Sequence, residues 1–369
     1  MKRVTFVNKY LFSFFFLFGI TTSIFLFLNL QSCKNPTAPK GNNPPDTTSH
    51  NFTWTQYEFG SQQGPSNFKD VAIVNDSDIW AVGEIHTNDS IYNAVHWDGK
   101  EWELKQIMFP LCDANGNQQG FGSYPANSIF AFLANDIWIT CNVSLVHWDD
   151  QNFKPICITM GYGQRDLGKI WGIKNQLYFI GTDGFIAMYS NSMWTQFESG
   201  TTIDLRDVWG SSDGKTVWAC GYSNDYGSSV LLKYYGNTWA TLWLKQPSST
   251  SPPYEYFISS LWASDNYLYV AADIGIFRTS LKGNYSTQKV LTLSSGPHSI
   301  RGSADNNIAI ALDDGSIWHY NGTTWFKETN SGQLKPLYSI AVSKNTIVAV
   351  GFDATNINWQ GLLLIGRRN

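Results

Sequence analysis

The sequence predicts an all-β fold, a seven-bladed β-propeller whose blades are four-stranded antiparallel sheets. The main observation is a short apolar phrase that follows a polar turn and recurs along the chain. It occurs at DIWAVG (78–83), DIWITC (136–141), QLYFIG (176–181), TVWACG (216–221), YLYVAA (267–272), NIAIAL (307–312) and TIVAVG (346–351). Runs of β-branched and aromatic residues bounded by turn residues are typical of strands. Helical periodicity is absent beyond residue 51.

Each recurrence lies within a longer unit. A second phrase follows it, as in AVHWDGKEW (94–102), and reads as a strand, a tight turn and an aromatic residue that opens another strand. A third phrase, such as FKDVAIV (68–74), precedes it. Units of about 40–50 residues with four strands are the signature of propeller blades. We expect each blade to be apolar on both sides and to be covered by its neighbours.

The two ends of the domain indicate how the ring closes. The aromatic residue after the turn occurs six times, at Trp102, Phe153, Trp194, Trp239, Tyr285 and Trp325. The last unit ends at GRRN and lacks its outer strand, whereas FTWTQYEF (52–59), with Trp54, precedes the first unit. We therefore predict that the N-terminal strand completes the last blade, which also removes exposed sheet edges.

The repeats resemble those of bacterial β-propeller repeat proteins, with the pattern W-A-V-G followed by dG-x-W. This resemblance covers residues 52–369. It implies the propeller fold and says little about activity, because propellers support many unrelated functions.

The N-terminus predicts export. Lys2, Arg3 and Lys9 precede an almost wholly apolar run, Tyr10–Leu30, which ends in Leu-Gln-Ser-Cys33. This ending resembles the lipobox of bacterial lipoproteins, which implies cleavage before Cys33 and acylation of Cys33 by fatty acids such as palmitate. The alternative is an uncleaved transmembrane anchor.

The predicted domain organisation follows from these boundaries. Residues 1–32 form a lipoprotein signal peptide, residues 33–51 a disordered tether rich in Pro, Asn and Thr, and residues 52–369 the propeller. We expect a lipid-anchored protein of the cell envelope, at the outer membrane or cell surface rather than the inner membrane. The formal net charge of −4 argues against nucleic-acid binding.

The cysteines other than Cys33 contain no CxxC pair or zinc-binding spacing. Cys112, Cys141 and Cys157 lie in one unit, so one disulfide is possible, but the pairing stays open. Cys220 lies at an apolar strand position and is expected to be a buried thiol.

Residues that recur once per blade are interpreted as architecture. This interpretation covers most tryptophans, including Trp80, Trp138 and Trp218. It also covers His96, His147 and His319, which align in the third strands of different blades, while His50 falls in the tether. No metal site, cofactor or catalytic residue is therefore expected, and no motif for nucleophilic or paired-acid catalysis is evident.

The long connections break the symmetry, because all of them belong to one face of the predicted propeller. They carry aromatic residues among Asn, Gln, Ser and Gly, a mixture suited to binding. The candidate binding residues are Tyr92, Phe121, Tyr124, Tyr162, Tyr222, Tyr226, Tyr254, Tyr256 and Trp359. The sequence thus favours a non-enzymatic binding or scaffold lipoprotein with a protein or glycan ligand on this face.

Two alternatives remain. The first is a carbohydrate-active enzyme, a glycan hydrolase or glycosyl transferase that uses the same face. The second is a structural subunit of an envelope assembly.

Overall fold

The computed structural model describes residues 46–368, apart from 62, 114, 143, 159–165, 174, 226, 247–253, 255, 256 and 284. The predicted signal peptide, Cys33 and residues 34–45 of the predicted tether lie outside the described residues. Within the described residues, no helix has the length and apolar character needed to cross a bilayer.

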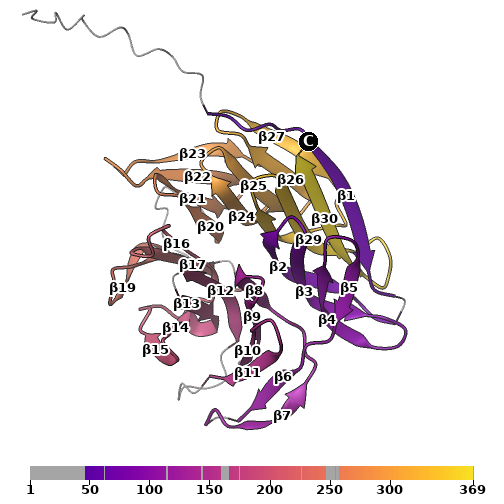
Figure 1. Ribbon diagram of the computed structural model, residues 1–369. Helices are drawn as coiled ribbons and strands as arrows, with labels where there is room; N and C mark the ends of the chain where they lie inside the picture. Colours follow the sequence, from indigo (N-terminus) through magenta and orange to yellow (C-terminus); the bar gives the residue numbers. More distant parts are fainter. Residues whose placement is uncertain are drawn as a thin grey trace, which may run out of the picture. The chain divides into compact units, whose positions relative to one another are not determined.

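The strands of the described residues form seven four-stranded antiparallel sheets arranged as blades, which confirms the predicted all-β seven-bladed propeller (Figure 1). The first blade contains β2 (Asn67–Asn75), β3 (Asp78–His86), β4 (Ile91–Trp97) and β5 (Trp102–Lys105). The second contains β8 (Ser128–Leu133), β9 (Asp136–Cys141), β10 (Ser144–Trp148) and β11 (Phe153–Cys157), and the third β12 (Leu167–Ile173), β13 (Gln176–Gly181), β14 (Ile186–Ser190) and β15 (Met193–Phe197).

The next three blades repeat this order, with the strand of lowest number innermost. The fourth contains β16 (Leu205–Gly210), β17 (Val217–Tyr222), β18 (Ser229–Tyr234) and β19 (Trp239–Lys245). The fifth contains β20 (Ile258–Ala263), β21 (Tyr267–Ala272), β22 (Gly275–Ser280) and β23 (Thr287–Thr292), and the sixth β24 (Pro297–Ala304), β25 (Asn307–Leu312), β26 (Ser316–Tyr320) and β27 (Trp325–Asn330).

The seventh blade joins the two ends of the domain, as predicted. It consists of β28 (Leu337–Val342), β29 (Thr346–Asp353), β30 (Gln360–Arg368) and, outermost, β1 (Phe52–Phe59). In Figure 1, β1 in indigo lies along β30 in yellow. Trp54 faces Gly366 across this pair, and a Cβ at Gly366 would lie 2.8 Å from the indole ring. The indole therefore requires a glycine opposite it.

The hydrophobic core lies between the blades. Buried side chains of the described residues form seven clusters, and each cluster joins two neighbouring blades. The recurrent aromatics belong to these clusters: Trp80, Trp138 and Trp218 are 5%, 7% and 2% exposed. This confirms their interpretation as packing residues, because apolar area buried between blades stabilises the ring.

The two faces of the ring differ. On the face that we call the short-turn face lie the turns between the first and second and between the third and fourth strands of each blade. The opposite, long-loop face carries the other connections, including the short 3₁₀ helix η1 (Thr182–Gly184) and the hairpin of β6 (Phe109–Cys112) and β7 (Gln118–Gly122).

A disulfide attaches this hairpin to the second blade. Cys112 in β6 is bonded to Cys157 at the end of β11, whereas Cys141 and Cys220 are buried free thiols. The pairing that the sequence left open is thus Cys112 with Cys157, and the prediction for Cys220 is confirmed.

Substitution of Cys112 by Ser should lower the free energy of unfolding by about 2–4 kcal/mol, because the cross-link restricts the unfolded chain. Thermal denaturation with and without dithiothreitol tests this. The reductant should lower the melting temperature of the wild type to that of Cys112→Ser and leave the variant unchanged. A wild type that does not respond would contradict the prediction.

Candidate functional site

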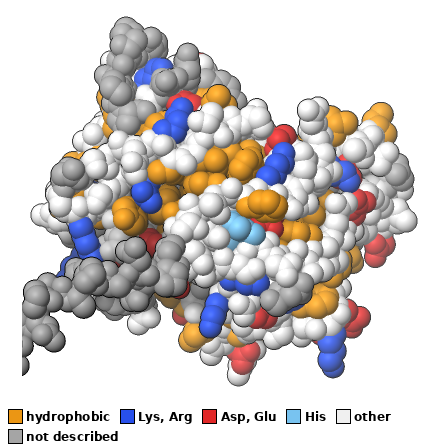
Figure 2. All heavy atoms as spheres, turned by 90° about the horizontal axis from the view of Figure 1, so that it is seen from above, with side chains coloured by type: hydrophobic (Ala, Val, Ile, Leu, Met, Phe, Trp, Pro, Cys, Tyr) orange, Lys and Arg blue, Asp and Glu red, His pale blue; other side chains and the backbone are white. Residues whose placement is uncertain are grey.

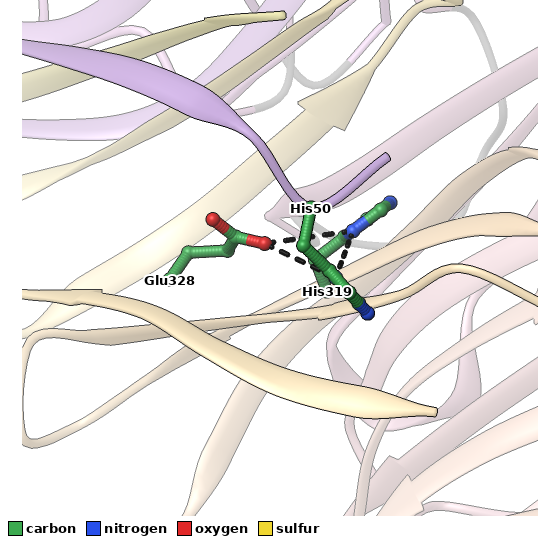
Figure 3. A group of neighbouring side chains, drawn as sticks. All are labelled: His50, His319 and Glu328. Atoms are coloured by element: carbon green, nitrogen blue, oxygen red, sulfur yellow. Dashed lines mark hydrogen bonds and ion pairs between the residues drawn. The ribbon is translucent and has the colours of Figure 1, made fainter. Parts of the chain in front are cut away.

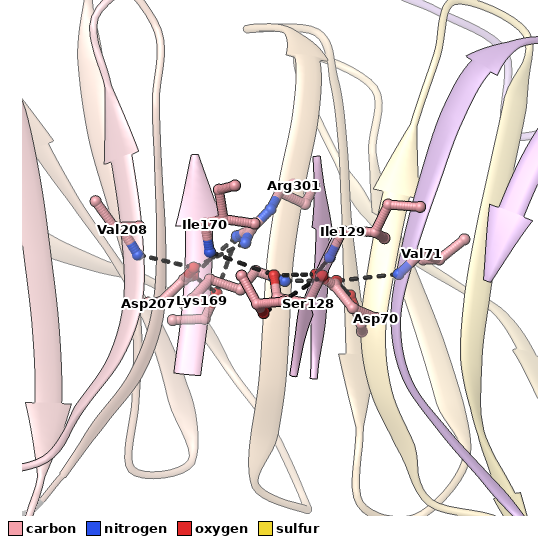
Figure 4. Close-up of polar contacts among 12 residues, drawn as sticks. Asp70, Val71, Ser128, Ile129, Lys169, Ile170, Asp207, Val208 and Arg301 are labelled. Carbon is pink, nitrogen blue, oxygen red and sulfur yellow. Dashed lines mark hydrogen bonds and ion pairs between the residues drawn. The ribbon is translucent and has the colours of Figure 1, made fainter. Parts of the chain in front are cut away.

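The channel at the centre of the ring is lined by a recurrent polar position. The innermost strands each carry a polar residue at the same register: Asp70, Ser128, Lys169, Asp207, Ser260, Ser299 and Ser339. In six of these strands the position follows a register shift, as between Phe68 and Asp70. Such bulges redirect a side chain. Several of these side chains converge near the axis (Figure 4).

One ion pair in this channel is centred on Asp70. Its carboxylate accepts hydrogen bonds from Lys169 Nζ at 2.5 Å, Ser128 Oγ at 2.6 Å, Ser339 Oγ at 2.7 Å and the backbone N–H of Ile129 at 3.0 Å. Burial alone raises the pKa of Asp70, but the charge of Lys169 and these hydrogen bonds outweigh it and hold the pKa below its usual value. The lowered pKa favours the ionised form of Asp70, and the hydrogen bonds hold its carboxylate in place.

The second ion pair joins Asp207 and Arg301. The two terminal nitrogens of Arg301, Nη1 and Nη2, each donate to one carboxylate oxygen of Asp207 at 2.8 Å, which is a bidentate arrangement. The Ser260 hydroxyl and the backbone N–H of Leu261 also donate to Asp207. Burial lowers the pKa of Arg301, but the adjacent Asp207 charge raises it on balance. Arg301 also covers the ring of Trp209, at 4.8 Å from its centroid.

Two adjoining cavities lead from the channel to the short-turn face. The inner cavity, of about 210 Å³, is lined by Asp70, Lys169 and Arg301, and the outer one, of about 530 Å³, forms the mouth. They share Phe130, Trp209 and Gly302 in their walls. We call the outer cavity the channel mouth. Its size is within the range of about 300–1,000 Å³ of small-ligand sites.

The channel mouth combines aromatic walls with polar groups. Trp171, Trp209 and Trp262 line it, of which Trp209 is only half-buried. At its rim Ser212 donates to Asp265, and Asn266 Nδ2 donates to Asp305 Oδ2 at 2.6 Å. Oδ1 of Asp305 is buried and receives no hydrogen bond from the described residues.

The predicted anchors on the long-loop face have different environments. Phe121, Tyr124 and Trp359 are exposed, at 51%, 36% and 40%, and Trp359 stacks on Phe352 with 4.5 Å between centroids. Tyr92 and Tyr222 are half-buried. Figure 2 shows the molecule from above relative to Figure 1, and on this side hydrophobic side chains gather in several patches separated by polar ones.

The prediction for Tyr254 was wrong. This residue is 3% exposed, because its ring packs between Trp243 and Phe277 at centroid distances of 5.0 and 5.1 Å. It is therefore part of the core between the fourth and fifth blades. Tyr162, Tyr226 and Tyr256 lie outside the described residues.

Sequence reasoning missed the channel, although a signal was present. The third repeated phrase carries Asp, Ser or Lys at one position in all seven units. The recurrent histidines were interpreted correctly in two blades: His96 bonds Asp78 at 2.9 Å and His147 bonds Asp136 at 2.7 Å, each stacked on a tryptophan.

The comparisons show the fold. Neither a family model nor a curated protein matches the sequence. A structure of similar fold is YCF48 bound to D1 peptide, with a TM-score of 0.61, 16% identity and coverage of 88% of this chain and 98% of that one. An inactive virginiamycin B lyase from Staphylococcus aureus with quinupristin has a TM-score of 0.59, 11% identity and coverage of 84% and 99% of the two chains. The WD40 propeller of Doa1 has a TM-score of 0.61, 10% identity and coverage of 86% and 98%. At these identities the likeness extends to the propeller alone.

The Asp207–Arg301 pair should behave as one unit in a double-mutant cycle. Arg301→Met or Asp207→Leu alone should cost about 3–5 kcal/mol of unfolding free energy, because each leaves a buried charge unpaired. The double variant should lose less than the sum of the two. Urea denaturation measures all four proteins.

Arg206→Met is the matched control, since the exposed Arg206 contacts Asp204 at 3.3 Å on the surface. It should change the stability by less than about 1 kcal/mol. Additive effects of the Arg301 and Asp207 substitutions would show that the two residues do not depend on each other.

Proposed function

We propose that this chain is a non-enzymatic binding module of the cell envelope that receives its ligand in the channel mouth. The observation that supports this is the combination of aromatic walls, polar rim and preformed depth in one cavity on the ring axis. Ligand sites are typically preformed concave pockets with apolar walls and few polar groups. The proposed binding surface is therefore on the short-turn face, whereas the sequence favoured the long-loop face.

The chemistry of the mouth supports a ligand with a planar or apolar face and hydrogen-bond donors. Trp209, held by Arg301, presents an indole surface for stacking. Asp305 and Asp265 present carboxylate oxygens at the rim for N–H or O–H groups. A peptide segment and a glycan both have this character, so the ligand class is protein or glycan.

The floor of the site supports binding rather than acid–base catalysis. Asp70 is paired with Lys169 and accepts several hydrogen bonds, which hold its pKa below the usual value despite its burial. A general acid would need a raised pKa. Among proteins of similar fold, YCF48 is described with a bound peptide and virginiamycin B lyase is described as an enzyme. Catalysis on carbohydrate therefore remains the alternative to be tested.

The envelope location rests on the lipobox-like ending at Cys33. An acyl chain contributes about 0.8 kcal/mol per buried CH₂, so a multiply acylated cysteine would hold the propeller at a membrane.

A blocking substitution tests the binding site. Ser212 is an exposed residue of the mouth, and Ser212→Trp should fill the cavity at little cost in stability. Arrays of envelope glycans and of peptides from envelope proteins provide the ligand. Ser212→Trp should weaken the retained ligand at least about tenfold, an energy of about 1.4 kcal/mol.

Thr202→Trp is the matched control, because Thr202 is exposed in a cavity of about 540 Å³ on the long-loop face. It should bind as the wild type does. The reverse result, with Thr202→Trp impaired and Ser212→Trp normal, would move the site to the long-loop face. Chemical turnover of a retained glycan would replace the binding function with an enzymatic one.

The anchor is tested separately with Cys33→Ser. Because acylation needs the thiol, we expect the variant to lose incorporation of labelled palmitate and to leave the membrane fraction. Unchanged incorporation and fractionation would contradict a lipid anchor at this residue.

A further inference from the structure

Two histidines and a glutamate meet at the outer side of the sixth blade (Figure 3). They are His50, which precedes β1, His319 in β26 and Glu328 in β27. The sequence had placed His50 in the tether, away from any site. Here His50 Nδ1 lies 2.8 Å from His319 Nδ1 and 3.3 Å from Glu328 Oε1, and His319 Nδ1 lies 3.6 Å from Glu328 Oε1.

The spacing of the three atoms matches a metal coordination shell. Ligands of a tetrahedral zinc ion, with bonds of about 2.0–2.1 Å, lie about 3.3–3.4 Å from one another. The three observed distances between these atoms, 2.8, 3.3 and 3.6 Å, are close to this value. An ion at the centre of this triangle would thus be at bonding distance from all three atoms.

The outer ring nitrogens are held so that both Nδ1 atoms present lone pairs. Asn307 donates its amide to Ser343 O at 2.9 Å, so its Oδ1 must accept from His319 Nε2, 2.9 Å away. His50 Nε2 lies 3.2 Å from the hydroxyl of Thr324, which itself donates to Asn321. Outer hydrogen bonds of this kind orient metal-binding imidazoles.

Glu328 provides an independent observation. Its side chain is 3% exposed, and its buried Oε1 receives no hydrogen bond from the described residues. A buried carboxylate oxygen without a hydrogen bond is costly, and two imidazoles that present lone pairs cannot donate one to it. A shared proton between the imidazoles would leave this oxygen unsatisfied, whereas a divalent cation would bind all three groups.

The site arises where the sixth blade departs from the repeat. In the first blade His96 is stacked on Trp80, but the residue paired with His319 is Ala309. The start of β1 lies against His319 instead, with Phe52 at a centroid distance of 5.2 Å. A register shift between Ile317 and Trp318, which also occurs at the equivalent positions of the fourth and fifth blades, leaves Glu328 without a partner in β26 and turns it inward.

We propose that His50, His319 and Glu328 bind one divalent cation of the zinc type, with water completing its coordination. Two imidazoles and a carboxylate favour zinc over magnesium or calcium, which prefer oxygen ligands. The ion cross-links the segment before β1 to the sixth blade, close to the strands β1 and β30, whose pairing closes the ring. His50, whose side chain is 21% exposed, leaves an open route for the ion.

Zinc alone is the probe. The full-length protein is purified in detergent through a tag without histidine, stripped with EDTA and titrated with Zn²⁺ by calorimetry. We expect one ion per chain and a higher melting temperature with zinc. His50→Ala and Glu328→Gln should each weaken binding at least about 100-fold, since loss of an outer-sphere partner alone costs 10–100-fold.

His147→Ala is the matched control, because His147 occupies the equivalent position in the second blade and bonds only one carboxylate there. It should bind zinc as the wild type does. Co²⁺ should give a tetrahedral absorption spectrum that His50→Ala lacks. Near-ultraviolet circular dichroism of the metal-free variants checks that they are folded. No stoichiometric zinc in the wild type, or equal affinity in His50→Ala and Glu328→Gln, would overturn the proposal.

Discussion

Hydrogen bonds between neighbouring inner strands are the constraint on which the ring depends. The polar side chain of one blade accepts a backbone N–H of the next: Asp70 from Ile129, and Asp207 from Leu261. Ser260 accepts in the same way from Ile300. These groups are buried, so each must find a partner within the protein. These bonds join the inner strands of the first and second, fourth and fifth, and fifth and sixth blades in addition to their hydrophobic contacts.

The two buried carboxylates find their cationic partners only in the closed ring, so the stability of the fold depends on closure. Asp70 on the first blade is neutralised by Lys169 on the third, and Asp207 on the fourth by Arg301 on the sixth. Each charge would be costly without a partner that the chain brings from two blades away. Arg301 also covers Trp209, so the wall of the channel mouth is positioned by the same ion pair that joins the fourth and sixth blades.

The sequence could predict everything that repeats along the chain. The blade count, the closing strand with Trp54 and the packing role of Trp80 follow from periodicity, because equivalent residues have equivalent neighbours in a propeller. Contacts that occur at only one place in the fold could not be predicted from the periodicity. Tyr254 follows a long loop, yet it packs between Trp243 and Phe277, and His50 meets His319 across 269 positions of sequence. No local pattern encodes such contacts.

The rule that recurrent residues are architectural also explains why the channel mouth was missed. Two residues after the polar position, the inner strands carry Phe130, Trp171, Trp209 and Trp262 in consecutive blades, then Arg301, and alanine at 72 and 341. Under that rule, aromatic residues that recur at this position would count as structural. The change to arginine and alanine, however, confines the aromatic wall to one side of the axis and leaves the channel mouth asymmetric. In a ring of equivalent blades, it is the interruption of a repeat near the axis that creates a site.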